Sequence, residues 1–483
     1  MGERAKTVSA EEMGRQREFM ELVRAENELL RKENGRQPSA LVETYGCQQN
    51  EADSEQIRGM LRQMGYRFTD SQREADLIVM NTCAVRAHAE QRVLGNVGAL
   101  THAKRSNPDQ IICLCGCMMQ EGHMAEKMKR SFRHVDLVFG PHALWRFPEL
   151  LQRRRAAGGR IFDVEDGPGR VAEGLPVYRQ GKPKAFVSIM QGCNNFCSYC
   201  IVPYVRGRER SRMPEPILRE VEMLVSEGYK EITLLGQNVN SYGKDIGAGV
   251  DFAGLLRRLN ELPGEFLIRF MTSHPKDASL RLFQAMGDCA KVAPHLHLPF
   301  QAGNDRVLKA MNRGYTKADY LDLVREAREA VPGLVLTSDV IVGFPGETSR
   351  EFEDTLDVLR EVRFDALFTF LYSPREGTPA AKLPDPLSRA EKQENFDRLL
   401  NLQNEISARR HHAYVGRTLR VLVDGESGNE PYNLSARTAG GRLVHLSGDS
   451  RRIGSFVLAE ITDASTWALF GAMKESLHEN GVL

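Results

Sequence analysis

Six apolar, β-prone segments recur along residues 185–405, and each is followed by a stretch with helical periodicity. Strands that alternate with helices predict a parallel sheet, either open or curved into part of a barrel, with its chemistry at the carboxyl ends of the strands. The predicted strands cover residues 185–190, 231–235, 267–271, 295–298, 334–342 and 366–371. We therefore expect a partial, TIM-like (β/α)6 barrel within residues 183–410.

Different patterns flank this core. Apolar runs within residues 39–155 alternate with helix-like stretches and predict a small α/β domain. Residues 156–182 hold glycines and prolines with little periodicity and indicate a linker. Short β-rich runs separated by glycines make residues 411–476 typical of a small all-β barrel of the OB type. The chain is thus predicted to be an α/β multidomain protein.

Residues 1–38 predict a helical extension. A helix rich in Glu, Arg and Lys covers residues 9–34, with a seam at Met13, Met20, Val23, Asn27 and Leu30. Because short isolated helices are marginal in water, we favour a solvated, partly frayed appendage over a docking helix.

The composition and the apolar pattern indicate the cell compartment and the kind of surface that could bind nucleic acid. Apolar residues make up 41% and charged residues 27%, which excludes collagen-like and wholly disordered chains. The 65 Lys and Arg nearly balance the 64 Asp and Glu, so RNA or DNA could be bound only by local basic patches. The sequence shows neither a membrane-spanning apolar run nor a signal peptide, so we expect a cytoplasmic protein with no membrane partner. In that reducing compartment, the nine cysteines suggest metal ligation rather than disulfides.

Cys193, Cys197 and Cys200 directly follow the first strand of the predicted barrel, in MQGCNNFCSYC. Three thiolates at this spacing on a loop can hold three corners of a 4Fe-4S cluster and leave the fourth iron open to substrate. A zinc site would require a fourth protein ligand, and a redox dithiol would leave Cys193 unexplained. We therefore favour the cluster.

Cys47, Cys83 and Cys117 lie far apart in the first domain, and each follows an apolar strand-like run. Their loops could converge on one edge of a sheet, although buried free cysteines are also common as small core residues. Alternation places Cys113 and Cys115 on the same face of one strand, whereas Gly116 marks a turn that frees Cys117. Cys113, Cys115 and Cys289 are therefore expected in the core.

The cysteine loop resembles the radical S-adenosylmethionine (SAM) enzymes, and the resemblance extends over residues 39–475. TYGCQQNEADS, NTCAVR and CLCGCMMQ resemble the first domain of the methylthiotransferases in that class. The match continues through LLGQNVNSY, IRFMTSHP, HLHLPFQAGNDRVLKAMNRGYT, DVIVGFPGET and YSPREGTPA to a TRAM-like domain. YGCQ, IVPYVRGRERSR and LLGQNVNSY favour the branch that adds a methylthio group to carbon 2 of N6-isopentenyladenosine at position 37, beside the tRNA anticodon.

The resemblance implies two 4Fe-4S clusters and SAM as cofactors. It places the radical SAM cluster on Cys193, Cys197 and Cys200, and an auxiliary cluster on Cys47, Cys83 and Cys117. SAM would serve both as the methyl donor and as the source of a 5′-deoxyadenosyl radical, because carbon 2 of adenine carries a hydrogen that no general base removes at a useful rate. The auxiliary cluster would supply the sulfur. An electron donor and a sulfur or iron-sulfur supply system are implied as partners.

Polar residues at or after the later strands are candidates for SAM binding, although turn residues that satisfy local backbone have the same composition. Tyr199, within the cysteine loop, is expected beside the cluster or the SAM adenine. The other candidates are Gln237, Asn238, Ser273, His274, Gln301, Asp339 and Gly343.

Basic residues predict contacts with the tRNA anticodon stem-loop. Arginines are frequent just after Cys193, Cys197 and Cys200, which we call the second cysteine triplet. Other arginines lie in the terminal barrel, where they suit recognition of RNA shape and backbone. A charge run is more often a solvated face, but its place beside the cysteines favours RNA. The candidates are Arg206, Arg208, Arg210, Arg212, Arg437 and Arg442.

Two alternatives remain. A related enzyme could methylthiolate threonylcarbamoyladenosine in tRNA or an aspartate of a ribosomal protein, although YGCQ and RGRERSR argue against both. A protein of another class, a non-catalytic iron-sulfur protein that binds RNA or a partner, would leave the polar residues after the barrel strands without a purpose.

Overall fold

The computed structural model describes residues 7–84, 87–164, 167 and 169–474, with only the backbone of residues 87–89. Residues 1–6 of the predicted extension and residues 475 and 476 of the predicted terminal barrel lie outside the described residues. The chain forms two compact units. The first comprises Met1–Gln180, Met190–Phe196 and Cys200–Arg212, and the second comprises Gly181–Ile189, Cys197–Tyr199 and Met213–Leu483.

The first unit is built on a six-stranded parallel sheet in the order β2-β1-β3-β4-β5-β6. Its central strands contain almost only buried residues, as expected for a sheet covered on both faces. The strands are β1 (Ser39–Thr44), β2 (Arg67–Phe68), β3 (Leu77–Thr82), β4 (Ile111–Gly116), β5 (Leu137–Phe139) and β6 (Ile161–Asp163). The predicted small α/β domain is confirmed.

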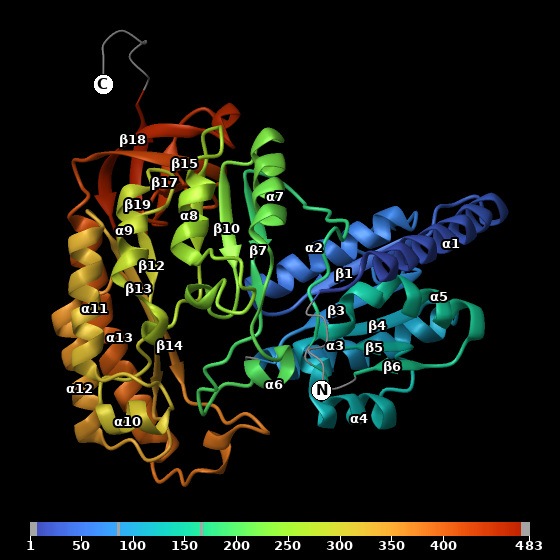
Figure 1. The fold of residues 1–483 in the computed structure, drawn as a ribbon, viewed down its shortest axis with the longest axis horizontal. Helices are drawn as coiled ribbons and strands as arrows, with labels where there is room; N and C mark the ends of the chain where they lie inside the picture. Colours follow the sequence, from blue (N-terminus) through green and yellow to red (C-terminus); the bar gives the residue numbers. More distant parts are fainter. Residues whose placement is uncertain (1–6, 85–86, 165–166, 168, 475–483) are drawn as a thin grey trace. The chain divides into compact units, whose positions relative to one another are not determined.

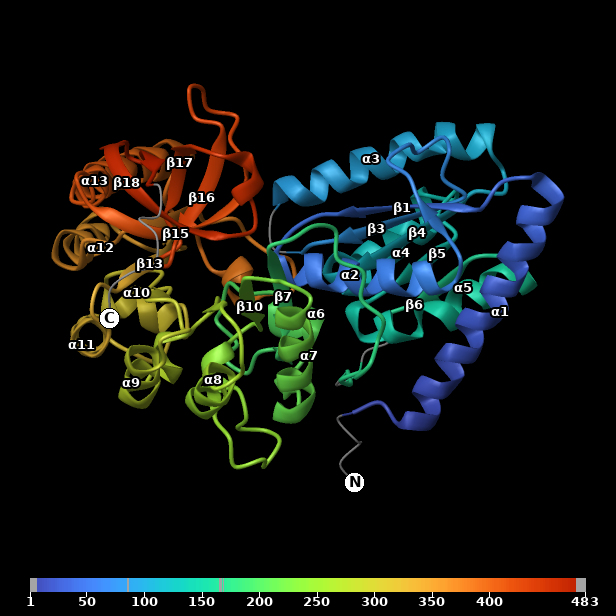
Figure 2. The same cartoon turned by 90° about the horizontal axis from the view of Figure 1, so that it is seen from above.

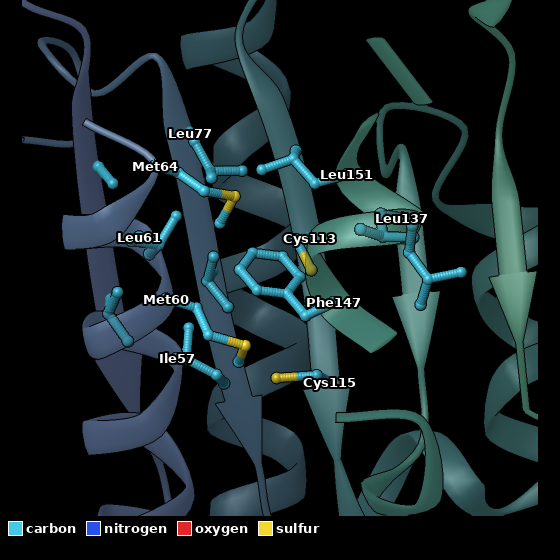
Figure 3. Packing of buried hydrophobic residues seen from close by; sticks show 14 of the residues in the cluster. Ile57, Met60, Leu61, Met64, Leu77, Cys113, Cys115, Leu137, Phe147 and Leu151 are labelled. Atoms are coloured by element: carbon cyan, nitrogen blue, oxygen red, sulfur yellow. The ribbon is translucent and has the colours of Figure 1, made fainter. Parts of the chain in front are cut away.

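Helices cover both faces of this sheet (Figures 1 and 2). One face packs on α1 (Ala10–Asn34), α2 (Gln48–Gln63) and α5 (Phe147–Ala157) through apolar side chains such as Ile57, Met60 and Phe147 (Figure 3). The opposite face packs on α3 (Ala87–Ser106) and α4 (Gly122–Ser131) through Val97 and Met128. Alternate strand residues point into these two clusters, which is the period of two that a strand imposes.

Helix α1 is not the solvated appendage that we favoured. Met13, Met20 and Val23 are buried, and Met20 and Val23 belong to the core of the sheet. Asn27 donates a hydrogen bond to the Met64 carbonyl at 2.8 Å. The correction has a simple cause, because the apolar seam that could not stabilise an isolated helix is buried against α5 and α2.

The predicted linker at 156–182 is also more ordered than its composition suggested. Strand β6 extends the sheet beyond residue 155 by parallel pairing with β5. Further along, the Tyr178 ring stacks on Phe68 at 5.3 Å between centroids, and the Tyr178 amide donates to the Glu55 carbonyl at 2.9 Å. Three-residue strands and single aromatic contacts are too short to appear as periodicity.

A short antiparallel pair in the first unit joins β8 (Met190–Gln191) to β9 (Arg210–Ser211). The pair closes the base of the chain segment that carries the second cysteine triplet. Within this segment, α6 (Val202–Arg206) begins two residues after Cys200. Residues 200–212 thus belong to the first unit, although the sequence joins them to the barrel strands.

The second unit contains two three-stranded parallel sheets, β11-β10-β7 and β12-β13-β14. A parallel bridge between Ile268 and Val292, just before β12, continues the strand order from one sheet to the other. The strands are β7 (Lys184–Ser188), β10 (Glu231–Leu235), β11 (Leu267–Phe270), β12 (His295–His297), β13 (Val335–Val342) and β14 (Ala366–Leu371). All six predicted strands are therefore present, in the parallel order of an open barrel.

Seven α-helices are described in this unit, and capping boxes at Thr316, Thr348 and Ser388 begin three of them. They are α7 (Pro214–Ser226), α8 (Phe252–Asn260), α9 (Leu280–Asp288), α10 (Asp305–Ala310), α11 (Lys317–Ala330), α12 (Ser349–Val362) and α13 (Arg389–His412). Across the described part of the chain, no helix combines the length and the apolar character needed to cross a membrane.

The described part of the second unit ends in a closed five-stranded barrel in the order β15-β16-β17-β19-β18. Leu434, Val444 and Leu469 belong to its apolar interior, and the alternate residues point outward. The strands are β15 (Thr418–Glu426), β16 (Leu434–Thr438), β17 (Leu443–Ser447), β18 (Phe456–Ala464) and β19 (Leu469–Met473). The predicted all-β barrel is confirmed.

Candidate functional site

Cys47, Cys83 and Cys117 follow the carboxyl ends of β1, β3 and β4, which are neighbours in the sheet. Cys47 is the N-cap residue just before α2, and Cys117 begins the 3₁₀ helix η1 (Cys117–Gln120). Parallel strands end at the same edge, so three segments that are distant in the sequence bring their cysteines to one place. The three cysteines thus converge on one edge of the sheet, as expected.

Two glycines let the chain turn tightly beside these cysteines. Gly46 has a φ of +121°, and a Cβ atom there would lie 2.3 Å from the Cβ of Cys83. Gly116 has a φ of +94°, and its Cβ would lie 2.3 Å from Oδ1 of Asn81. Positive φ and close approach both require glycine. The predicted turn at Gly116 is thus the point at which β4 releases Cys117 from the core.

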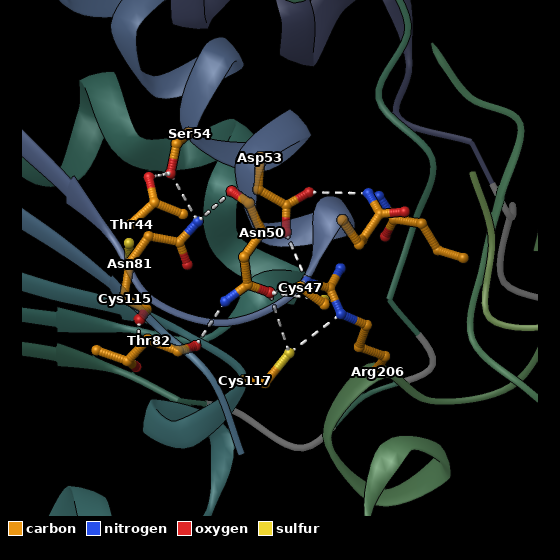
Figure 4. A network of polar contacts seen from close by, with 12 residues as sticks. Thr44, Cys47, Asn50, Asp53, Ser54, Asn81, Thr82, Cys115, Cys117 and Arg206 are labelled. Atoms are coloured by element: carbon orange, nitrogen blue, oxygen red, sulfur yellow. Dashed lines mark hydrogen bonds and ion pairs between the residues drawn. The ribbon is translucent and has the colours of Figure 1, made fainter. Parts of the chain in front are cut away.

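Asn50, on the first turn of α2, is held in one orientation at the centre of this site (Figure 4). Its Nδ2 donates to the carbonyls of Tyr45 at 2.9 Å and Thr82 at 3.0 Å. Its Oδ1 therefore faces the thiols of Cys47, at 3.7 Å, and Cys117, at 3.9 Å. One side chain thus ties together the segments that follow β1, β3 and β4.

Charge and burial act differently on the thiols. A hydrogen bond with Cys83 lowers the pKa of Cys47 to about 6, and the nearby Arg206 charge acts in the same direction. Burial raises the pKa of Cys117 to about 11, against the opposing effect of Arg206. The hydrogen bond with Cys83 and the charge of Arg206 thus favour the thiolate form of Cys47, which is the form that binds metals.

The residues of this edge suit an iron-sulfur cluster. Among the described residues, no three His, Cys, Asp or Glu side chains are arranged to hold a single metal ion. A four-iron cluster binds each thiolate at a different iron, so its ligands need not approach one another as closely as at one ion. Such a group fits this edge, because the donors are all thiols, Arg206 is buried beside them and Gly46 has no side chain to occupy the space.

The three cysteines outside the two candidate cluster sites are core residues, as expected. Cys113 and Cys115 are fully buried in the cluster that packs on α1, α2 and α5 (Figure 3). Cys289 is buried in the second unit. Burial raises the pKa of Cys113 and Cys115 well above the usual thiol range, so both stay protonated and unreactive.

The second triplet is divided between the two units. Cys193 and Cys200 belong to the first unit, where the Cys193 amide donates to the Gly207 carbonyl at 3.1 Å. Cys197 belongs to the second unit and is buried. Its sulfur lies 3.3 Å from Nη1 of Arg313 and 3.8 Å from Nε2 of His274.

Arg313 and His274 present N–H groups to the Cys197 sulfur. Arg313 is buried and also donates to the Pro299 carbonyl at 2.7 Å and to the Tyr315 hydroxyl at 3.0 Å. Burial and the Arg313 charge lower the pKa of His274 to about 2, so its imidazole is neutral. Because its Nδ1 accepts from the Lys276 amide at 3.2 Å, the single proton lies on Nε2, toward the sulfur.

The predicted SAM-binding residues all belong to the second unit, where Asp339 lies within β13 and the others lie beyond the ends of strands. The Tyr199 hydroxyl lies 3.4 Å from Nη1 of Arg313. Asp339 faces His297 Nε2 at 3.4 Å, and the Gly343 amide donates to the Glu347 carboxylate at 2.8 Å. Gln237 follows β10 and is half-buried.

Three of these residues carry buried polar atoms with no hydrogen-bond partner among the described residues: Asn238 Oδ1, Ser273 Oγ and Gln301 Oε1. An unmet buried acceptor costs about 1–3 kcal/mol, so such atoms suit a polar ligand. Thr272, next to Ser273, and Gln301 also have φ values of +72° and +68°. Left-handed backbone at a β-branched residue is strained, and strain of this kind gathers at functional sites.

The structure corrects three of the predicted RNA contacts. Arg206 and Arg210 are each 3% exposed, and Arg442 is buried against Asp365 and the Tyr414 ring. Arg212 is paired with Glu173 at 2.8 Å, and Arg437 with Asp424 at 3.4 Å. Of the six, Arg208 is exposed, with its guanidinium 4.3 Å from the centre of the Phe196 ring. The sequence alone could not distinguish buried arginines from exposed ones in one charge run.

Three sequence models match separate parts of the chain. Residues 187–359 match the Radical SAM superfamily, residues 39–140 match Uncharacterized protein family UPF0004, and residues 412–474 match the TRAM domain. Among solved structures, the radical S-adenosylmethionine methyltransferase TsrM from Kitasatospora setae, with tryptophan and a SAM analogue bound, has a TM-score of 0.52. It is 16% identical and covers 71% of this chain and 74% of its own. Fold and site therefore define a radical SAM protein with a TRAM domain.

Close relatives narrow this class. A tRNA-2-methylthio-N(6)-dimethylallyladenosine synthase of Acetivibrio thermocellus is 50% identical over 96% of this chain and 97% of its own. The protein of the same name from Alkaliphilus oremlandii is 50% identical over 98% of this chain and 99% of its own. The chain belongs to the tRNA-2-methylthio-N(6)-dimethylallyladenosine synthase family. This confirms the predicted enzyme class, and SAM and 4Fe-4S clusters are the cofactors that the family uses.

Three residues of these sites escaped the sequence-based prediction. Asn50 and Asp53 stand three and six positions after Cys47, so the helical period places them on one face of α2. Arg313, within MNRGYT, carries no local signal, because only the fold brings it to Cys197.

Proposed function

We propose that this chain adds a methylthio group to carbon 2 of N6-isopentenyladenosine at position 37 of tRNA. The observation that carries the proposal is the convergence of Cys47, Cys83 and Cys117 on one sheet edge, in a chain that also has the Cys193, Cys197 and Cys200 triplet. Two sets of three thiols suit an enzyme that must both cleave SAM and supply sulfur. The names of the relatives supply the substrate.

We assign the 4Fe-4S cluster that cleaves SAM to Cys193, Cys197 and Cys200, and the auxiliary 4Fe-4S cluster to Cys47, Cys83 and Cys117. Bound there, the first would supply the electron for radical formation and the second the sulfur. The corresponding domain roles are sulfur supply for residues 39–155, SAM chemistry for residues 183–410 and RNA binding for residues 411–476.

Several residues of the chain would bind and orient the cluster and SAM. Arg313 and the Nε2–H of His274 point hydrogen-bond donors at the Cys197 sulfur and would stabilise the negative charge of a cluster bound there. Asn238, Ser273 and Gln301 bind polar groups of SAM through the buried atoms described above, and Tyr199 orders the loop through Arg313. A cytoplasmic location, an electron donor and a sulfur supply system follow from this activity.

The test is anaerobic turnover of the reconstituted protein with SAM, a reductant and an anticodon stem-loop containing isopentenyladenosine. Mass spectrometry should detect both the methylthio nucleoside and 5′-deoxyadenosine. Deoxyadenosine without the nucleoside would point to threonylcarbamoyladenosine or a ribosomal protein as the substrate. Neither product, with both clusters intact, would favour an iron-sulfur protein that only binds RNA or a partner.

The terminal barrel offers a surface for unpaired bases. His445 and Phe470 are direct partners on β17 and β19, and their rings stack at 5.6 Å between centroids. Tyr432 lies 5.3 Å from the same Phe470 ring. All three are partly exposed, and Arg437 projects from the neighbouring strand β16. Rings beside a cation are the elements that bind single-stranded RNA.

Replacing Phe470 by alanine should weaken binding of the anticodon stem-loop on the order of tenfold, because stacking on an aromatic ring contributes about 1–3 kcal/mol per base. Fluorescence anisotropy with a labelled stem-loop measures the change. Leu458→Ala is the matched control, since Leu458 is an exposed apolar residue of the same barrel without a ring. Equal losses in the two variants would argue against a stacking surface.

A further inference from the structure

Arg206 lies at the end of α6 and is buried beside Cys117, where a phosphate could not reach it (Figure 4). Its Nε donates to the Cys117 sulfur at 3.1 Å. Its Nη2 donates to Oδ1 of Asn50 at 3.0 Å and to Oδ2 of Asp53 at 2.6 Å. The guanidinium thus connects a predicted cluster ligand to a carboxylate on α2.

The pair of Arg206 and Asp53 is almost completely removed from solvent, with exposures of 3% for both residues. Burying two charges is costly unless they pair closely and their remaining polar atoms are satisfied. The second oxygen of Asp53 accepts from Gln49 at 3.1 Å. Nη1 of Arg206, in contrast, has no hydrogen-bond partner among the described residues. One buried donor of the pair is therefore left for a group that the polypeptide does not provide.

Apolar contacts fix the same segment. Ile201 and Val205 pack with Cys117 and Ala84 in one small buried cluster within the first unit. Ile201 directly follows Cys200, and Ala84 directly follows Cys83. The guanidinium therefore cannot swing away from the cysteines without dislodging α6. A fixed charge and a fixed donor are what tuning of a bound cofactor requires.

We propose that Arg206 is a positioning residue of the auxiliary cluster, whose sulfur atoms accept hydrogen bonds from its Nε and Nη1. Its positive charge, held in place by Asp53, stabilises the reduced and more negative state of the cluster. The inference rests on the proposed function, which assigns a cluster to Cys47, Cys83 and Cys117. Hydrogen bonds to sulfur and nearby charge are both known to set the potential of iron-sulfur clusters.

Opposite charge changes at the two residues should shift the reduction potential of this cluster in opposite directions. Arg206→Gln removes a positive charge and should make the midpoint potential more negative. Asp53→Asn leaves the guanidinium uncompensated and should make the potential less negative. The double variant should return toward the parent value. Loss of packing alone would not produce shifts of opposite sign.

The parent for these measurements is the full chain with Cys193, Cys197 and Cys200 all replaced by alanine, so that one cluster remains. Anaerobic redox titration followed by electron paramagnetic resonance gives the potential, and iron analysis gives the loading. Arg208→Gln is the matched control, because it removes an exposed charge two residues away and should leave the potential unchanged. Arg206→Lys keeps the charge without the planar fork and should fall between the parent and Arg206→Gln.

The outcomes separate this inference from the proposed function. A parent that binds no iron would overturn the assignment of the cluster to Cys47, Cys83 and Cys117. A loaded parent whose potential is unchanged in Arg206→Gln and Asp53→Asn would overturn the role of Arg206 alone. If Arg206→Gln fails to hold the cluster, the Lys and Asn variants still give the sign of the shift, and a shift of the same sign in both would contradict the proposal.

Discussion

Replacing Cys193 by alanine should reduce 5′-deoxyadenosine formation from SAM to background, whereas Cys47→Ala should retain that reaction and lose methylthio transfer. The two cysteines follow strands of different sheets and carry different proposed clusters. Without Cys193, the site that cleaves SAM lacks one of its three ligands. Without Cys47, the site that supplies sulfur lacks one of its three ligands, but Cys193, Cys197 and Cys200 are all still present.

Both products can be followed in a single anaerobic assay, with deoxyadenosine and the methylthio nucleoside quantified from the same sample. Cys289→Ala is the control, because Cys289 is buried outside both cysteine sets and should leave both products in place. Equal loss of deoxyadenosine in the Cys193 and Cys47 variants would refute the division of labour. Iron content per chain shows whether each variant lost one cluster or both.

Gly46→Ala should lower methylthio transfer on the order of 100-fold, an effect typical of displacing a reactive group by about an ångström. The added methyl group would lie 2.3 Å from the Cβ of Cys83, and neither atom sits on a flexible side chain that could move aside. The segment after β1 or the one after β3 must therefore shift. SAM cleavage at the second triplet should persist.

Gly35→Ala is the matched control for this variant. Gly35 also has a positive φ, +68°, but nothing lies within 4 Å of its added Cβ. It should lose only about 1–2 kcal/mol of stability from the left-handed backbone and keep full transfer activity. Thermal unfolding, iron content and nucleoside yield compare the two. Similar behaviour of both alanine variants would mean that strain, rather than the approach to Cys83, controls the site.

The barrel strands could be predicted because each lies in an apolar run that is bounded by turns and followed by a helical stretch. The predictions for 231–235 and 366–371 coincide with β10 and β14, and the other four are within one or two residues of the observed strands. Strands β6, β16 and β19 were missed. These strands are recognised only through their partners in the sheet.

The cysteines of the candidate sites could be found from spacing and resemblance, but their surroundings could not. Arg206 was predicted as an RNA contact because its neighbours are basic, yet its partner Asp53 is 153 residues away in the sequence. Arg313 approaches Cys197 across 116 residues. The sequence shows how many basic residues a segment has, but only tertiary packing determines which of them are buried.

Cys113, Cys115 and Cys117 stand at alternate positions, and two of them are in the core of the sheet while the third begins η1. Backbone hydrogen bonds to β3 and β5 fix this register. In evolutionary terms, the connections are free to gain or lose residues away from the strand ends, because each of Cys47, Cys83 and Cys117 lies within three residues of the strand that precedes it. A two-residue deletion within β4 is different, since it would retract Cys117 to the depth of Cys115 and bury a thiol that has to meet its partners at the edge.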